Sequence, residues 1–330
     1  MEILFLLGNG FDLNLGLKTS YKDFYKFYKN QSSKSDKINE LKKEIFKNFE
    51  NWSDLELALG KYTKNIESLE EFDEIYEDII EKLSIFLAIE DDKLENDQFI
   101  TNKNNLYNDL LYPEDTLIEV NKNIIKSYKD RWGSNSWNIN IITFNYTKSI
   151  EKLLDYNGRR ISLGMSSENN YLNEINHIHG YVDDKMVMGV NDVSQVSNIK
   201  FHKNQDIKDA LIKVDSNKAC GHEIDSRCEQ LIKSSNLICI FGSSLGETDK
   251  KWWNLVGNQL IRNDCQLIIF EKIEEIPQRI KHREERIRRE KRNYFLEKTE
   301  LNEEEKKIAL ENIFIGLNTT LFSNIHTFEL

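Results

Sequence analysis

Proline, cysteine and long apolar runs are scarce in this chain of 330 residues. The two prolines, Pro113 and Pro277, leave room for long uninterrupted helices, and Pro113 predicts a helix boundary near Tyr112. Four cysteines without CxxC spacing argue against a disulfide framework and a four-cysteine zinc site, so we expect reduced thiols. No apolar run approaches the roughly 20 residues of a membrane span, so we expect no membrane partner.

A signal peptide and an excess of basic charge are also missing. The apolar residues 3–7 lack a basic leader and a small-residue cleavage site, which predicts a core strand in a cytoplasmic protein. The net charge of −11 disfavours nonspecific adhesion to nucleic acid. A hydrophobic content of 39% beside 31% charged residues is typical of a globular protein.

The stretch 279–292 is a local exception to this charge balance. Arginine and lysine are dense there and alternate with Glu284, Glu285 and Glu290. Mixed charge at spacings of three and four residues is typical of a solvated helix face. A nucleic-acid contact through residues 279–292 is the alternative.

Apolar runs and amphipathic patterns divide the chain into three parts. Runs at residues 3–7, 139–144, 174–178, 186–188, 237–241 and 266–270 predict strands of a parallel sheet. Between residues 22 and 131, apolar residues recur every three or four positions, which predicts amphipathic helices. We therefore expect an α/β protein: a Rossmann-like core from residues 1–25 and 132–271, an inserted helical subdomain at 26–131 and a charged helical segment at 272–330.

A glycine turn follows the first apolar run, with the sequence Gly8-Asn9-Gly10-Phe11-Asp12. Glycines at positions 8 and 10 lack the Cβ atoms that would keep a phosphate away from the main chain. Backbone N–H groups at the start of the next helix supply donors and a positive dipole end, so the pattern predicts a dinucleotide site. A sharp turn is the alternative, and the missing third glycine of the usual fingerprint argues against a standard dehydrogenase.

Polar residues follow the apolar run at 139–144, in the sequence Thr143-Phe144-Asn145-Tyr146-Thr147. A carboxamide both donates and accepts hydrogen bonds, so Asn145 at a strand end suits fixing a ribose hydroxyl or holding a water for attack. A helix cap or a turn is the alternative for Asn145 and especially for Thr147.

Two histidines, His177 and His179, lie at the end of the run at 174–178. In a strand they would share a face, but no further ligand lies at a spacing that completes a metal site, so we expect no metal. His179 borders Gly180, and histidine, with an ordinary pKa of about 6.5, suits a general base near neutral pH. A hydrogen-bonded core histidine is the alternative.

The run at 237–241 ends in the small residues Gly242, Ser243 and Ser244. Small hydroxyl residues let a ligand approach the backbone and offer hydrogen bonds to phosphate or ribose. A capping loop with Thr248 or Asp249 as the helix cap is the alternative.

Taken in order, these motifs resemble the core of the sirtuin-type NAD-consuming fold. The glycine turn, with Leu17 after Gly16, is similar to the family's Gly-Ala-Gly-Ile-Ser and Gly-Ile-Pro opening, and Gly242–Leu245 is similar to its Gly-Thr-Ser-Leu nucleotide loop. In that family an asparagine of Thr-Gln-Asn and the histidine of His-Gly lie beside the nicotinamide ribose. The resemblance implies these roles for Asn145 and His179.

A closer resemblance is to the AbiH family of bacterial phage abortive-infection proteins. Its Gly-Asn-Gly-Phe-Asp opening, its Gly-Leu-x-Thr-x-Tyr-x-x-Phe motif and its Trp-x-Asp-Leu-Glu motif match Gly8–Asp12, Gly16–Phe24 and Trp52–Glu56. The match extends as spaced islands over residues 1 to 270, with Thr-Phe-Asn-Tyr-Thr and His-Ile-His-Gly further on. The sirtuin opening's Pro, Asp and Arg are replaced at positions 18–20 and its cysteine-rich zinc module is absent, which argues against deacylation of acetyl-lysine.

The resemblance implies an antiphage effector that is an NAD glycohydrolase, with NAD as its substrate and no metal. Asn145 would position water or a ribose hydroxyl, His179 would act as general base, and Asp12 would bond the ribose diol or stabilise cationic character at the anomeric carbon. Helix-start capping is the alternative for Asp12. The residues implied to bind NAD are Gly8, Asn9, Gly10, Phe11, Gly16, Thr19, Tyr21, Thr143, Tyr146, Gly242, Ser243 and Ser244.

Two other functions stay open at this point. A module that senses NAD or ADP-ribose without turnover needs the glycine loops but not both Asn145 and His179. A toxin that targets nucleic acid is the weaker alternative, because a nuclease needs a carboxylate–metal constellation. Assembly into a homo-oligomer and a phage-derived trigger are left open, and the helical insert is the expected place for a gate or subunit contact.

Overall fold

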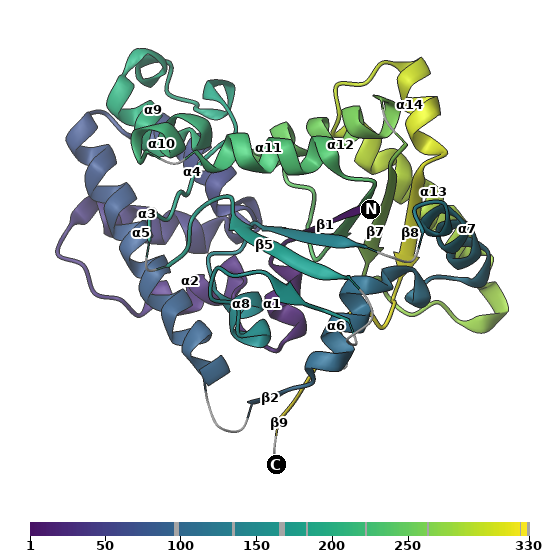
Figure 1. Ribbon diagram of the computed structural model, residues 1–330. Helices are drawn as coiled ribbons and strands as arrows, with labels where there is room; N and C mark the ends of the chain where they lie inside the picture. Colours follow the sequence, from purple (N-terminus) through teal and green to yellow (C-terminus); the bar gives the residue numbers. More distant parts are fainter. Residues whose placement is uncertain are drawn as a thin grey trace.

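A seven-stranded, mostly parallel sheet forms the centre of the computed structural model (Figure 1), which describes residues 1–95, 99–133, 136–164, 169–182, 184–221, 223–262, 264–323 and 325–328. Within these residues the strand order is β4-β5-β3-β1-β6-β7-β8, and only the β4–β5 pair is antiparallel. The strands are β1 (Glu2–Leu7), β3 (Asn138–Thr143), β4 (Ile161–Ser162), β5 (Tyr171–His177), β6 (Leu237–Phe241), β7 (Gln266–Glu271) and β8 (Ile313–Leu317).

Five of the six predicted strands are confirmed, as β1, β3, β5, β6 and β7. The strand predicted at residues 186–188 is wrong: Val187 and Met188 lie outside any strand, and their backbone bonds to His179 and to the Tyr76 hydroxyl. The short apolar run is instead buried in a loop. Strand β8 was not predicted, and it lies in the segment 272–330 that was expected to be helical.

Helices cover both faces of the sheet, as the apolar central strands require. Successive side chains of β1 alternate between two cores, with Phe5 in one and Leu6 in the other. Helices α1 (Gly10–Asn14), α6 (Lys103–Leu111), α7 (Glu119–Asp130) and α8 (Ser149–Leu154) contribute to the first core. Helices α11 (Ile224–Ser234), α12 (Lys250–Arg262), α13 (Arg283–Glu297) and α14 (Glu303–Leu310) contribute to the second.

A separate group of helices, the helical unit, packs beside the sheet (Figure 1). Its members are α2 (Tyr21–Lys29), α3 (Asp36–Lys47), α4 (Leu55–Tyr62), α5 (Leu69–Asp91), α9 (Gln205–Leu211) and α10 (Lys213–Ala219). The amphipathic helices predicted between residues 22 and 131 are confirmed, and α6 ends just before Tyr112 as Pro113 predicted. The apolar core of the helical unit also takes in residues from 188–212, whereas α6 and α7 pack on the sheet. The domain boundaries themselves stay a prediction.

The strand order creates a crevice at the carboxyl end of the sheet. The chain adds β3 and β5 on one side of β1, then crosses to add β6, β7 and β8 on the other. Open α/β sheets bind ligands at such a switch point, just outside the strand ends. Away from this edge, β2 (Phe99–Thr101) and β9 (His326–Phe328) form a small antiparallel pair. No helix within the described residues is both long and apolar enough to cross a membrane.

Candidate functional site

A cavity of about 500 Å³ lies over the switch point. Loops after β1, β3, β6 and β7 form one wall, and the segments leading into α2, α4 and α10 of the helical unit form the other. Most of the predicted site residues line this cavity: Gly8, Asn9, Gly10, Asp12, Thr19, Tyr21, Asn145, Tyr146, His179, Gly242, Ser243 and Ser244.

Three predicted NAD-binding residues lie outside the cavity lining. Phe11 is fully buried and packs edge-on against Phe322, with ring centroids 5.4 Å apart. Gly16 follows the end of α1 with a φ of +83°, a conformation that terminates the helix. Thr143 is buried at the end of β3, where its Oγ1 accepts a hydrogen bond from the backbone N–H of Asn145 at 3.1 Å.

The glycine turn and the loop after β6 pack backbone to backbone. The N–H of Gly8 donates to Phe241 O at 2.9 Å, and the N–H of Gly10 donates to Gly242 O at 2.8 Å. A Cβ on Gly10 would lie 2.5 Å from Gly242 Cα, and Gly242 itself has a φ of +70°. The glycines are therefore needed for loop packing, and two of the amides in the stretch predicted to bind phosphate, those of Gly8 and Gly10, already have acceptors. The following helix, α1, has five residues, so its dipole is also small.

Asn9 of the glycine turn is hydrogen-bonded to Thr19, which lies just before α2. Their side chains bond to each other at 2.5 Å, and Asn9 Nδ2 also donates to the Thr19 backbone carbonyl at 3.1 Å. Both side chains line the cavity, but their polar groups already fasten the turn to the segment before α2.

Asn145 is held by its backbone and leaves a side-chain acceptor open. Its carbonyl accepts from His177 Nδ1 at 3.0 Å, and His177 Nε2 faces Glu151 at 2.6 Å, so this histidine has a structural role. The side chain of Asn145 is 7% exposed and hydrogen-bonds to the Asp12 carboxylate. Its Oδ1 is buried and has no hydrogen-bond partner among the described residues.

Asp12 lies deep in the cavity wall and holds the loop after β3. Its two carboxylate oxygens accept hydrogen bonds from the hydroxyls of Thr147 and Ser149, each at 2.6 Å. Burial raises the pKa of Asp12 to about 6, although these hydroxyl donors oppose the shift. The side chain does not cap α1, and it is committed to residues that position Asn145.

His179 has one ring nitrogen bound and one open. Its Nε2 lies 2.9 Å from Asp249 Oδ1. Because a carboxylate accepts hydrogen bonds, Nε2 carries the proton of the neutral ring, and Nδ1 carries the lone pair. Nδ1 is buried and has no partner among the described residues. The rings of Phe144 and Tyr146, which flank Asn145 in sequence, lie 5.7 and 6.4 Å from the His179 ring. The asparagine loop and the histidine therefore converge on one cavity.

A buried charged chain extends from this histidine into the helical unit. Lys213 Nζ lies 2.8 Å from both Asp249 Oδ1 and Glu56 Oε2, and Glu56 Oε1 accepts from the Tyr146 hydroxyl at 2.9 Å. Burial alone would lower the pKa of Lys213, but the carboxylates of Asp249 and Glu56 hold it above its usual value. Burial alone would raise the pKa of Asp249, but the charge of Lys213 and the hydrogen bond from His179 hold it well below its usual range.

Sequence reasoning missed this charged chain. Asp249 was weighed only as a helix cap, and Glu56 was named only as part of the Trp-x-Asp-Leu-Glu motif. Lys213 carries no local signal, because it lies in a polar segment beside the apolar Ile212. The motif that contains Glu56 is the one signal from which part of the chain could have been found.

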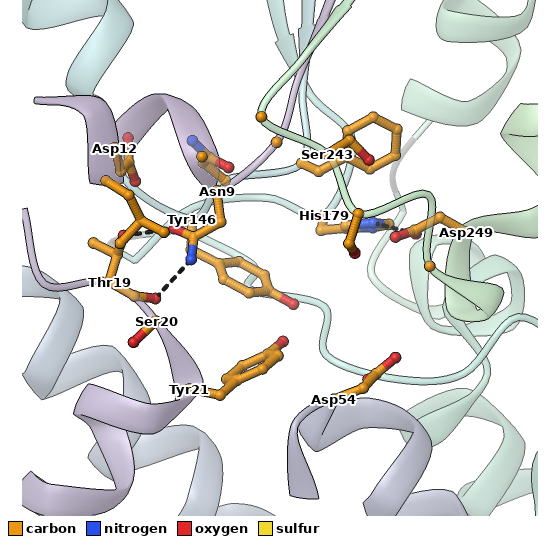
Figure 2. A pocket seen from close by; sticks show the side chains of 18 of the residues that line it. Asn9, Asp12, Thr19, Ser20, Tyr21, Asp54, Tyr146, His179, Ser243 and Asp249 are labelled. Carbon is orange, nitrogen blue, oxygen red and sulfur yellow. Dashed lines mark hydrogen bonds and ion pairs between the residues drawn. The ribbon is translucent and has the colours of Figure 1, made fainter. Parts of the chain in front are cut away.

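Asp54 and Tyr21 lie on the cavity wall formed by the helical unit, and Tyr146 lies opposite them in the loop after β3. Figure 2 shows the hydroxyl ends of Tyr21 and Tyr146 pointing toward the middle of the cavity, near Asp54. Asp54 Oδ1 caps α4 by accepting from Leu57 N–H at 3.0 Å. Burial raises the pKa of Asp54 above its usual value, and Glu56 adds to the rise.

The arrangement suits proton transfer to a general base. A carboxylate–imidazole pair with an open nitrogen is typical of a general base, and a neighbouring amide oxygen can hold the proton donor in line. Among the described residues, no three His, Cys, Asp or Glu side chains gather in a geometry that would hold a metal ion.

The basic stretch 279–292 forms most of α13, outside the cavity. Several of its arginines pair with glutamates of the same helix, including Arg286 with Glu290 at 2.9 Å and Arg288 with Glu284 at 3.0 Å. Lys291 instead binds Glu271 at the end of β7, 3.0 Å away, which fastens α13 to the sheet.

Comparison with known proteins gives one family. The chain matches the family model described as bacteriophage abortive infection AbiH over residues 4–271, a range that holds every cavity residue except Lys272. A comparison with curated proteins found no match.

Proposed function

The chain belongs to the AbiH family of bacteriophage abortive infection proteins, and from this premise we propose that its cavity hydrolyses NAD at the bond between nicotinamide and ribose. The fold is an α/β sheet whose switch point carries the cavity, which is where such sheets hold dinucleotides. We propose a sirtuin-like arrangement of that core, since the glycine turn, the asparagine and the histidine follow strands in the same order.

One observation carries the proposal. Asn145 Oδ1 and His179 Nδ1 are both buried hydrogen-bond acceptors without a partner among the described residues, and their side chains line one cavity. A buried acceptor left unpaired costs free energy, about 1–3 kcal/mol. Two such acceptors beside one cavity therefore favour a ligand or water that donates to both.

A water molecule with one O–H donated to each acceptor supplies the chemistry. The C1′–N1 bond of NAD breaks with its electron pair leaving on nicotinamide, and positive charge develops on the ribose as an oxocarbenium ion. The water oxygen then forms the bond to C1′, and its proton passes to His179 Nδ1. The products are nicotinamide, ADP-ribose and a proton released when the imidazolium returns to neutral.

The remaining residues have supporting roles in this proposal. Asp249 orients the imidazole and stabilises its protonated form, while Lys213 and Glu56 hold Asp249 in place. Asp12 positions the asparagine loop rather than touching the ribose. The hydroxyls of Ser243 and Ser244 and the exposed Lys272 are the groups we assign to the diphosphate, because the amides of Gly8 and Gly10 are already bonded.

The test is nicotinamide release from NAD by the purified full chain, followed by chromatography with and without lysate of phage-infected cells. We expect release by the wild type, and losses of at least about 100-fold in Asn145→Ala and His179→Ala. Asn123→Ala and His282→Ala are the matched controls, because both residues are exposed and lie outside the cavity.

Undiminished release in both folded cavity variants would refute the mechanism. Binding of NAD by the wild type with no release under either condition would make the cavity a nucleotide-sensing site instead. Loss of release in the two exposed controls would show that the assay reports stability rather than chemistry.

A further inference from the structure

The cavity wall holds more negative than positive charge. Five carboxylates line it, from Asp12, Asp54, Glu56, Asp249 and Glu271, against two ammonium groups, from Lys213 and Lys272. Such a surplus favours a ligand group that brings a positive charge of its own.

Four of these carboxylates are compensated by protein groups. Lys213 lies between Glu56 and Asp249, Lys291 binds Glu271, and the Asp12 oxygens accept from two hydroxyls. Asp54 differs from them: it forms no ion pair with any part of the chain that the structure describes, and its Oδ1 serves only as the α4 cap.

The position of Asp54 suits a flat cationic group. It projects from the helical unit into the cavity, on the side toward which the hydroxyl ends of Tyr21 and Tyr146 point (Figure 2). A partly buried carboxylate attracts a cation more strongly than an exposed one does, because water screens its charge less. The unpartnered acceptors of Asn145 and His179 in the same cavity independently indicate a bound ligand.

We infer that Asp54 recognises the positively charged pyridinium ring of the ligand, so that the cavity selects the oxidised over the reduced dinucleotide. This inference rests on the proposed function and names the residue that sets its substrate selectivity. Reduction removes the ring's charge while leaving the diphosphate and both riboses unchanged. The two forms therefore differ in the group that Asp54 faces.

Equilibrium binding of NAD and NADH tests the inference without turnover when the full chain carries His179→Ala. We expect this variant to bind NAD at least about tenfold more tightly than NADH, the scale of one partly desolvated charge contact. Adding Asp54→Asn should weaken NAD binding by a similar factor and leave NADH binding nearly unchanged, so that the preference disappears. Asparagine is also a good N-cap, so this substitution preserves the bond to Leu57.

Glu271→Gln in the same background is the matched control, because this carboxylate lines the cavity but is paired with Lys291. Its preference for NAD should stay intact. An unchanged NAD-to-NADH ratio in Asp54→Asn, or a ratio that falls equally in Glu271→Gln, overturns the inference. If the wild type releases nicotinamide while this ratio stays unchanged, only the inference fails. If no variant binds either ligand and the wild type releases nothing, the proposed function fails with it.

Discussion

Replacing Lys213 with methionine removes a positive charge that lies between two buried carboxylates. The ammonium lies 2.8 Å from Glu56 and 2.8 Å from Asp249, and Lys213 and Glu56 are 5% and 6% exposed. Breaking a buried ion pair by removing one partner costs about 3–5 kcal/mol, because the remaining charge stays desolvated. We expect Lys213→Met to lower the free energy of unfolding by about this amount, a large share of the roughly 5–15 kcal/mol typical of a folded protein.

The stability lost in Lys213→Met should increase as the pH rises. Lys213 has a raised pKa in the fold, so its contribution is fully present below its unfolded pKa and persists through neutral pH. In the variant, the orphaned carboxylates bind protons more readily as the pH falls. The destabilisation should therefore be largest near pH 8 and smaller near pH 5.

Urea unfolding followed by circular dichroism at both pH values measures the effect. The double variant Lys213→Met with Glu56→Gln should recover part of the loss, because one orphaned carboxylate becomes neutral. Unfolding free energies of wild type and Lys213→Met that agree within about 0.5 kcal/mol at pH 5 and pH 8 would refute the reasoning.

Two further perturbations test the glycine turn and Asp12. Gly10→Ala places a Cβ 2.5 Å from Gly242 Cα, and the neighbour is backbone, so we expect a loss of about 1–3 kcal/mol in urea unfolding. Gly133→Ala is the control for Gly10→Ala, because a Cβ on Gly133 meets nothing within 4 Å and only the φ of +71° is strained. A loss of stability in Gly133→Ala equal to or larger than that in Gly10→Ala would contradict the packing argument. The pKa of Asp12 is raised to about 6, so ionising this buried group in the fold costs roughly 3 kcal/mol in full. The unfolded carboxyl is already partly ionised at pH 4, so the wild type should lose about 2–2.5 kcal/mol of stability relative to Asp12→Asn between pH 4 and pH 7. Urea unfolding of the wild type and Asp12→Asn across this pH range tests the prediction. Free energies of unfolding that change in parallel for the two proteins would contradict it.

The central strands were predictable because they are buried on both faces and appear as apolar runs. Residues 3–7 and 237–241 are examples, and both became neighbouring parallel strands. The run at 186–188 has the same composition, but its burial comes from the helical unit, and periodicity cannot separate the two environments. Strand β8 was missed because the charged residues of α13 and α14 dominate the segment around it.

The convergence of Asn145 and His179 followed from a general property of parallel sheets, whose carboxyl ends share one edge. Lys213 and Asp249 could not be found in this way, because their pairing depends on how the helical unit sits against that edge. The packing role of Gly10 could not be found for a similar reason: the backbone that approaches it belongs to Gly242, far away in the chain. Local sequence patterns identify the loops that form the cavity. Contacts between distant segments decide which polar atoms of those loops are left to bind a ligand.

The C-terminal segment extends the folding unit beyond the family match, which stops at residue 271. Strand β8 covers the outer edge of β7, and Phe322 fills the space beneath the glycine turn, with its ring centroid 5.4 Å from Phe11 and 5.0 Å from Phe241. A shortened protein that ends at residue 271 would expose the edge of β7. It would also lose the Phe322 ring that packs under both glycine loops. Expression work should therefore keep the tail, even though the family model ends before it.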